Sequence, residues 1–311
     1  MTLIENIGAP LNRIATQHVA IPQKAGHAPT VRRFDLNFER LAGLGCYHPA
    51  LGDAPLALEL RAVKRRLLRR LGYLRAASPR RGAIRSGRRR NVILTTSTRA
   101  GEGKTFTALN LALSLAIEDQ IETLLIDADA PRPKVRQALN LPQERGLLNR
   151  LVNPLLSVNG LLRRASEAPL SVLCAGDVDA TVRARAADLY AGDEFARVMA
   201  NLSAAAPDRL IILDAPPALA APDAVLLAKQ ADEIIFVVEA NQTPEPAVAS
   251  ALDELLDVNP NVSLILNRCA IGAGGPQYRA YERYDEQLGD DAIRENSLTR
   301  VDRKKGDLSN A

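Results

Sequence analysis

The chain has 311 residues, 47% of them hydrophobic, and is therefore long enough to bury one large core. Its three cysteines (Cys46, Cys174 and Cys269) are far apart and odd in number, which argues against a disulfide framework and a cysteine-based zinc site. No apolar run reaches the roughly 18 residues that a membrane-spanning helix needs, and the first residues lack a charged-then-apolar signal pattern. We therefore expect a cytoplasmic protein that is at most peripheral at the inner face of a membrane.

The formal net charge of +4 is distributed unevenly along the chain. Residues 61–90 hold 13 Lys and Arg and no Asp or Glu, whereas the rest of the chain holds 27 bases against 36 acids. The basic isoelectric point thus comes from one segment and does not describe the remainder. Nucleic-acid binding by the fold is therefore not expected.

Residues 1–54 show little sustained periodicity and are interpreted as an N-terminal extension. From Pro55 to Leu74, leucines and a valine recur at helical spacing between basic residues, which predicts an amphipathic basic helix; a linker follows as far as residue 90. Two interpretations of this basic arm, residues 55–90, stay open. It is either a solvated face or a contact site for an anionic membrane.

From residue 91 to 271, short apolar runs alternate with helical patterns. Continuous apolar strands that alternate with helices indicate an α/β fold with a mostly parallel sheet covered on both faces. In such folds the active site lies at the carboxyl ends of the strands. The predicted strands are 91–96, 122–127, 170–174, 209–214, 232–239 and 261–267, and the predicted helices are 104–117, 186–204, 221–231 and 244–257.

The segment TSTRAGEGKT directly follows the first predicted strand and opens a helical pattern. Gly101 and Gly103 permit positive φ and close approach of the backbone to a phosphate, while successive N–H groups at a helix N-terminus attract the anion. Lys104 is expected to reach the β- and γ-phosphates of ATP, and Thr105 to offer its hydroxyl to Mg²⁺. The alternative is a glycine-rich turn between a strand and a helix in which the GKT sequence occurs by chance. The predicted nucleotide-binding residues of this P-loop are Thr98, Arg99, Ala100, Gly101, Glu102, Gly103, Lys104, Thr105 and Phe106.

Two further predicted strands end in aspartates at the same edge of the sheet. The second strand runs into Asp127-Ala128-Asp129, and the fourth ends at Asp214. A carboxylate at this edge can hold Mg²⁺ directly or through water, and a second can orient an attacking hydroxyl, as phosphoryl transfer requires. The alternative for each aspartate is that it caps the following helix.

The set TSTRAGEGKT, LLIDADAPRP and LIILDAPP resembles the Walker A, Walker A′ and Walker B motifs of the bacterial tyrosine kinases, relatives of MinD/ParA-type ATPases in the MinD/ParA-like P-loop superfamily. The match covers roughly residues 55–285, and segments such as IIFVVEANQTP look like autokinases encoded beside exosortase and exopolysaccharide genes. The resemblance implies an ATP- and Mg²⁺-dependent kinase that phosphorylates C-terminal tyrosines in neighbouring subunits of a homo-oligomer and regulates exopolysaccharide biosynthesis. It also implies a membrane activator of the polysaccharide chain-length-determinant type.

The resemblance further assigns roles to single residues. Lys104 and Thr105 would bind phosphate and Mg²⁺, Asp127 would position or deprotonate the tyrosine hydroxyl, and Asp129 and Asp214 would lie around the metal. Asn267, which closes the last predicted strand, would lie near adenine. The implied catalytic residues are Lys104, Asp127, Asp129 and Asp214, and the implied metal ligands are Thr105, Asp129 and Asp214.

Two positions depart from the family pattern. Pro131 stands where an arginine is common after the second motif, and Arg132 follows one residue later. The Glu-x-x-Arg-x-x-Arg oligomerisation helix of some bacterial tyrosine kinases aligns here with Leu58, Arg61 and Lys64, so its acidic residue is missing.

Three of the six tyrosines, Tyr278, Tyr281 and Tyr284, fall within seven residues of the C-terminal tail, residues 272–311. The stretch is rich in Gly, Pro and charged residues and has no core pattern, so these tyrosines are expected to be exposed. A flexible tail can enter the active site of a neighbour without unfolding it, and the three are therefore predicted phosphoacceptors. An ordinary polar tail with chance tyrosines is the alternative.

Two other functions compete with the kinase. A MinD/ParA-like ATPase switch would hydrolyse ATP without phosphorylating a protein, but Arg99 stands where that class typically has a signature lysine. A nucleotide-binding regulator without catalysis is the third hypothesis. It is disfavoured because the predicted phosphate-binding, metal-binding and catalytic residues are all intact: Lys104, Thr105, Asp127, Asp129 and Asp214. A kinase of the eukaryotic type is not expected, because no HRD or DFG triplet is present.

Overall fold

The computed structural model describes residues 32–73, 84–85 and 88–269, and all of them belong to one compact unit. The predicted extension up to residue 31, much of the linker and the tyrosine-bearing tail lie outside these residues. The strands are β1 (Arg32–Phe34), β2 (Ile84–Arg85), β3 (Arg88–Arg89), β4 (Val92–Ser97), β5 (Thr123–Asp127), β6 (Arg163–Ala165), β7 (Leu170–Leu173), β8 (Leu210–Asp214), β9 (Glu233–Glu239) and β10 (Val262–Asn267).

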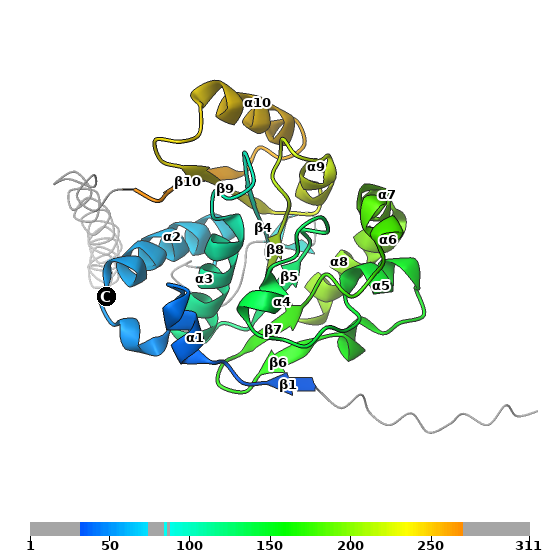
Figure 1. The fold of residues 1–311 in the computed structure, drawn as a ribbon, viewed down its shortest axis with the longest axis horizontal. Helices are drawn as coiled ribbons and strands as arrows, with labels where there is room; N and C mark the ends of the chain where they lie inside the picture. The colour runs from blue at the N-terminus through cyan, green and yellow to red at the C-terminus, as the bar shows by residue number, and fades with distance from the viewer. Residues whose placement is uncertain (1–31, 74–83, 86–87, 270–311) are drawn as a thin grey trace, which may run out of the picture. The chain divides into compact units, whose positions relative to one another are not determined.

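An eight-stranded sheet in the order β1-β6-β7-β5-β8-β4-β9-β10 forms the centre of the fold (Figure 1). From β7 to β10 every neighbouring pair is parallel, whereas β6 runs antiparallel to β7, and β2 and β3 form a separate antiparallel pair. The predicted mostly parallel α/β sheet is thus confirmed. Because β4, β5 and β8 are neighbours, the carboxyl ends of all three lie together at one edge of the sheet.

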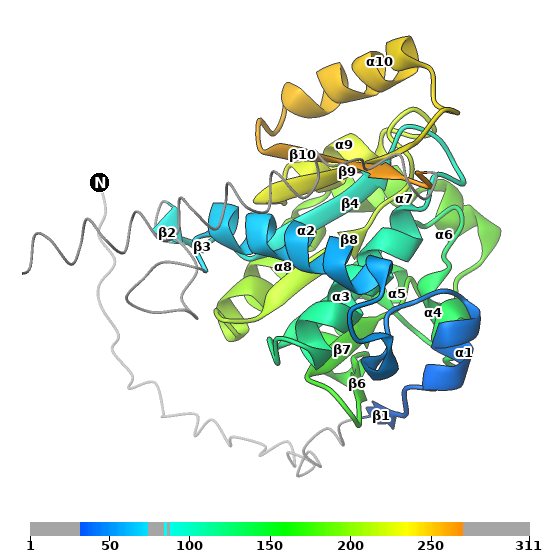
Figure 2. The same ribbon diagram turned by 90° about the vertical axis from the view of Figure 1, so that its left-hand side faces the viewer.

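Helices cover both faces of this sheet (Figures 1 and 2). The α-helices are α1 (Phe38–Gly43), α2 (Pro55–Leu71), α3 (Lys104–Ile117), α4 (Val135–Ala138), α5 (Leu147–Val152), α6 (Ala180–Ala184), α7 (Ala186–Ala191), α8 (Asp193–Ala205), α9 (Asp223–Ala228) and α10 (Glu245–Leu256). Short 3-10 turns occur at Pro49–Leu51 and Val158–Gly160. Among the described residues, none of the helices has the length and apolar character needed to cross a bilayer.

Two hydrophobic cores lie on opposite faces of the sheet. Because side chains alternate along a strand, the parallel strands β4, β5, β7, β8 and β9 contribute residues to both cores. In β4, Ile93 points into the core under α1, α2 and α3, while its neighbours Val92 and Leu94 point into the core under α5 and α7 to α10. Every residue of β4 is buried, which explains why this strand is a continuous apolar run rather than an alternating one.

Helix α3 is enclosed between the sheet and α2 (Figure 2). From Thr107 to Ala116 all of its side chains are buried, as expected for a helix that is apolar on almost every side. Helix α2 ends at Gly72, whose φ of 81° is left-handed and whose N–H bonds the carbonyls of Arg69 and Leu68. Glycine adopts this conformation without a Cβ penalty, so the helix ends cleanly there.

The described part of the predicted extension packs into the unit. Leu36 before α1, Leu41 within it and Tyr47 after it are 2–6% exposed and belong to the same core as α2 and α3. The Tyr47 N–H also donates to the side-chain oxygen of Asn110 on α3, at 2.5 Å. These contacts join residues far apart in the sequence, which is why periodicity alone does not reveal them. The division into segments 1–54, 55–90, 91–271 and 272–311 stays a prediction.

The cysteines occupy three different environments. Cys46 and Cys174 lie within the fold, and burial raises the pKa of both thiols, that of Cys174 to about 12. Cys269 follows β10 and is exposed, with its Sγ 3.5 Å from the Leu266 carbonyl. The fold therefore leaves one thiol open to solvent and protects the other two.

Candidate nucleotide site

The P-loop connects the buried strand β4 to the N-terminus of α3. Gly101 and Gly103 have φ of 95° and 100°, the left-handed region that glycine adopts without strain. Gly103 is the N-cap of α3, so the unpaired N–H groups of the first helical turn face the loop. Arg99, Ala100 and Gly101 are exposed at the tip of the loop, whereas Thr98 is fully buried.

Glu102 ties the loop to itself and to the neighbouring strands. Its carboxylate accepts hydrogen bonds from the Arg99 N–H at 2.8 Å and from the Thr243 hydroxyl at 2.7 Å. Its carbonyl accepts one from the Asn267 side-chain amide, also at 2.8 Å. Thr243 follows β9 and Asn267 ends β10, so the loop is held by residues that are distant in sequence. No local pattern in the sequence indicates Thr243, and the family resemblance implies a position near adenine for Asn267 without this contact.

Lys104, the first residue of α3, lies among carboxylates. Its Nζ donates a short hydrogen bond to Asp129, lies 3.8 Å from Asp214 Oδ1 and lies 3.4 Å from the Thr105 hydroxyl. Burial lowers the pKa of Lys104, but the charges of Asp214 and Asp129 outweigh it and the net pKa is raised. The lysine is therefore a cation whose present counterions are two aspartates, at the place where a phosphate is expected.

The three predicted aspartates come from two adjacent strand ends, since Asp127 on β5 pairs in register with Asp214 on β8. Asp127 is fully buried, and its two oxygens accept the N–H groups of Asp129 at 3.3 Å and Val135 at 3.0 Å. Burial, followed by the charge of Asp214, raises the pKa of Asp127 well above its ordinary value. Asp127 thus also shapes the loop that follows β5, in the manner of the capping interpretation.

Asp214 has the fewest hydrogen-bond partners of the three aspartates. Both of its carboxylate oxygens, like the hydroxyl of Thr98, are buried without a hydrogen-bond partner among the described residues. Burial raises the pKa of Asp214 to about 6, and the opposing effects of Lys104 and Thr105 only moderate this. Buried polar atoms without partners are rare, and here they lie where a ligand would supply them.

These oxygens suit a magnesium–nucleotide complex. Within the described ranges, no group of three or more His, Cys, Asp or Glu residues could hold a metal by itself. Mg²⁺ in nucleotide sites normally takes only one or two protein ligands, and phosphate oxygens and waters complete its shell. A hydroxyl from Thr105 and carboxylates from Asp129 and Asp214 form a donor set of that kind. The residues present therefore fit ATP with Mg²⁺.

Two further contacts fix the loop that carries Asp129. The Tyr190 hydroxyl, on α7, donates to the Ala128 carbonyl at 2.9 Å, and the Arg132 N–H donates to Asp129 Oδ1 at 3.1 Å. Tyr190 is 3% exposed, and its ring packs edge-on against Phe195 with the centroids 5.2 Å apart. No sequence pattern indicates Tyr190, because only the folded chain brings α7 to the end of β5.

The structure brings most of the predicted site together. Lys104, Thr105 and the aspartates lie beside the P-loop, and Asn267 touches that loop from β10. Phe106 differs, because its ring packs against the hydrophobic core on the α1 side. The predicted phosphoacceptors in the tail lie outside the described residues.

A buried strand, a glycine-rich loop at a helix N-terminus and two acidic strand ends define the chain as a P-loop nucleotide-binding protein of the parallel α/β class. The chain is 32% identical over 163 residues to the tyrosine-protein kinase YwqD of Bacillus subtilis (strain 168), a match that covers 52% of this chain and 65% of that protein. The solved kinase domain of VpsO is 28% identical, with a TM-score of 0.53, over 70% of this chain and 100% of that domain. The chain is thus similar in sequence to bacterial tyrosine kinases and similar in fold to a solved kinase domain of that kind.

A third relative is named for polysaccharide synthesis. The chain is 29% identical over 217 residues to the succinoglycan biosynthesis transport protein ExoP of Rhizobium meliloti (strain 1021), covering 69% of this chain and 27% of that protein. The chain thus spans less than two thirds of each of these two curated relatives. No protein-family model matches the chain.

Proposed function

We propose that this chain is a tyrosine autokinase that uses ATP and Mg²⁺ to phosphorylate Tyr278, Tyr281 and Tyr284 in the tail of a neighbouring copy. The observation that carries the proposal is the convergence of Lys104, Asp129 and Asp214 beside the P-loop. This combination of one cation, two or more carboxylates and helix N–H groups is what phosphoryl transfer requires of a protein, because catalysis depends on positioning and charge stabilisation.

Each residue of the cluster has a role in this proposal. Lys104 and the loop N–H groups hold the phosphates, while Thr105, Asp129 and Asp214 supply oxygen ligands for Mg²⁺. Bound ATP and Mg²⁺ would supply the phosphoryl group and a positive charge that offsets the crowded carboxylates. A bound phosphate would replace Asp129 as the counterion of Lys104, and the Asp129 carboxylate would then be available to Mg²⁺.

Asp127 is proposed to position or deprotonate the attacking hydroxyl. As the bond from the tyrosine oxygen to phosphorus forms, the bond between phosphorus and the leaving ADP oxygen breaks, and the hydroxyl proton passes to the carboxylate. The N–H groups of Asp129 and Val135 fix the orientation of the carboxylate. Its burial beside other acids makes the ionised form a stronger proton acceptor than a solvated aspartate.

Tyrosine burial supports the choice of acceptors. The chain has six tyrosines, and the three that the structure describes, Tyr47, Tyr73 and Tyr190, are only 2–6% exposed. A buried side chain cannot reach the catalytic centre of another molecule without local unfolding. The tail tyrosines are therefore the acceptors that this proposal requires.

The biological setting is part of the proposal. The resemblance to kinases of polysaccharide systems supports a role in regulating exopolysaccharide biosynthesis, together with a homo-oligomer and a membrane activator of the chain-length-determinant type. A position in the cytoplasm, at the inner face of the membrane through that activator, follows from the same proposal.

Mass spectrometry for phosphotyrosine tests the function. The purified chain is incubated with ATP and Mg²⁺ beside two variants, Lys104→Met and Asp127→Asn, first alone and then with the cytoplasmic segment of the candidate activator. We expect phosphate on the tail tyrosines in the wild type, none in either variant, and nucleotide binding that survives in Asp127→Asn. ATP hydrolysis without phosphotyrosine under both conditions would refute the kinase and identify an ATPase switch. ATP binding without any turnover would identify a regulator.

A further inference from the structure

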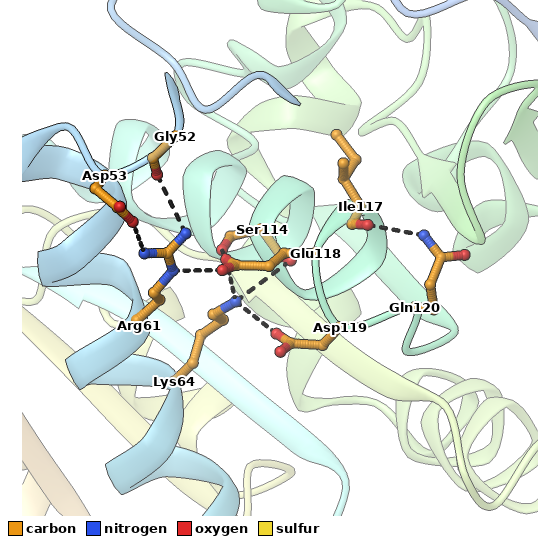
Figure 3. Close-up of polar contacts among 9 residues, drawn as sticks. All are labelled: Gly52, Asp53, Arg61, Lys64, Ser114, Ile117, Glu118, Asp119 and Gln120. Carbon is orange, nitrogen blue, oxygen red and sulfur yellow. Dashed lines mark hydrogen bonds and ion pairs between the residues drawn. The ribbon is translucent and has the colours of Figure 1, made fainter. Parts of the chain in front are cut away.

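Helix α2 carries six basic residues, and the fold divides them into an inward and an outward set. Figure 3 shows two members of the inward set, Arg61 and Lys64. Lys64 is 3% exposed, and its Nζ donates to Glu118 at 2.8 Å and to Asp119 at 2.5 Å, both just beyond the end of α3. Arg61 contacts Glu118 and Asp53. These two bases have their charges offset within the chain and fasten α2 to α3.

Two more arginines at the far end of the arm are also paired. Arg70 Nε lies 2.6 Å from Glu233, a fully buried carboxylate at the start of β9, and Arg90 lies 3.7 Å from the same side chain. The Arg90 guanidinium additionally donates to the Arg70 carbonyl at 2.9 Å. The inward contacts therefore hold α2 at both ends and fix which of its faces points to solvent.

On the outward face of α2, Arg65 and Arg66 keep their positive charge. Arg65, Arg66 and Arg69 are exposed, and Arg65 and Arg66 make no hydrogen bond or ion pair with any residue that the structure describes. Leu58, 45% exposed, lies on the same side, because residues 58, 65 and 69 are separated by whole helical turns.

We propose that this outward face, made of Leu58, Arg65, Arg66 and Arg69, is a docking surface for an anionic phospholipid membrane. An exposed leucine among arginines, on a helix whose other face is anchored, is the pattern by which a helix lies at the headgroup level with its apolar side chain inserted and its cations on lipid phosphates. The guanidinium groups of Arg65 and Arg66, unpaired among the described residues, place positive charge where the membrane is negative, and the exposed carboxylate of Glu59, two turns before Arg66, offsets only part of it. A nucleic acid fits less well, because the face carries no aromatic side chain for base stacking and exposes an apolar one.

Co-sedimentation with vesicles tests the surface independently of kinase activity. The full chain is mixed at low salt with vesicles of phosphatidylcholine alone or with 30% phosphatidylglycerol, a composition on the order of a strongly anionic leaflet. We expect binding only to the anionic vesicles. Arg65→Glu/Arg66→Glu should weaken it at least about 25-fold, because each arginine near such a surface contributes roughly a factor of five.

Two further variants distinguish specific docking on lipid from a general effect of net charge. Arg33→Glu/Arg145→Glu changes the net charge equally at exposed arginines of β1 and of the segment before α5, and should leave binding within about twofold. Leu58→Ser should weaken vesicle binding about fivefold but leave binding to a DNA duplex unchanged. Urea unfolding midpoints confirm that the variants fold. Equal loss in both charge-reversal variants, binding to neutral vesicles, or a Leu58→Ser variant that binds like wild type would overturn the proposal.

Discussion

Replacing Gly103 by alanine would put a methyl group into the contact between the P-loop and β10. A Cβ at Gly103 would lie 2.0 Å from the Asn267 side-chain nitrogen, and the residue has a φ of 100°. Gly101 provides a matched control, since its φ is 95° but nothing lies within 4 Å of the added Cβ. The two substitutions therefore share backbone strain and differ in the clash.

The magnitudes follow from these contacts. An alanine in the left-handed region costs about 1–2 kcal/mol, which is the whole expected effect of Gly101→Ala. Gly103→Ala must also displace the Asn267 amide from the Glu102 carbonyl and lose a hydrogen bond of about 1 kcal/mol, so its total is roughly 2–4 kcal/mol once residual strain is included. Asn267→Ala alone loses only that hydrogen bond, about 1 kcal/mol.

Urea denaturation of the single and double variants measures the coupling. Gly101→Ala and Asn267→Ala should be additive within about 0.5 kcal/mol, whereas Gly103→Ala with Asn267→Ala should destabilise by at least about 1 kcal/mol less than the sum of the two. ATP affinity, measured by calorimetry, should fall with Gly103→Ala because the first N–H groups of α3 are displaced. Additivity of the Gly103 and Asn267 substitutions would refute the steric argument.

Three other substitutions test the site and its support. Tyr190→Phe removes the hydroxyl that donates to the Ala128 carbonyl, so the free energy of unfolding in urea should fall by about 1–2 kcal/mol. The variant should also lower kcat several-fold at unchanged KM for ATP. An unchanged kcat would contradict a positioning role for Tyr190. Asp214→Asn removes a carboxylate whose pKa burial raises to about 6, so in metal-free buffer at pH 8 the variant should be up to about 3 kcal/mol more stable. That gain in stability should vanish as the pH falls from 6 to 4, because the Asp214 carboxyl of the native protein is then neutral. A gain that does not depend on pH would contradict the raised pKa of Asp214 as its cause. Lys64→Met should lower the unfolding free energy by about 2 kcal/mol, because its two acidic partners are partly solvated, and should leave nucleotide affinity unchanged.

Local signals explain how much of the fold was predictable. The parallel strands appear in the sequence as apolar runs because both faces of each are buried, and α3 appears because a glycine loop precedes an apolar helical pattern. The pattern at 186–204 predicts one helix, but Gly192 takes an extended ψ of 153° and divides it into α7 and α8. The short strands β1 and β6 carry arginines and no apolar run. β1 forms by pairing with β6, and β6 pairs in turn with β7, which no local pattern indicates.

The candidate site shows the same limit. The rule that parallel strands end at one edge was sufficient to bring Lys104, Asp129 and Asp214 together. The hydrogen bonds of Glu102 with Thr243 and Asn267 join residues more than 140 positions apart, so the spacing of residues in the sequence does not predict them. The sequence identifies the residues of the loop but not the contacts that hold its shape.

The exposed thiol of Cys269 makes the native chain suitable for spectroscopy without mutagenesis. A maleimide dye should react with it selectively at neutral pH, since burial raises the pKa of the other two thiols and the thiolate is the reactive form. The label would stand between the end of β10 and the tyrosine cluster that begins at Tyr278. Its anisotropy and energy transfer to a labelled neighbour would then follow the delivery of the tail into a second copy, in real time and in the unmodified sequence.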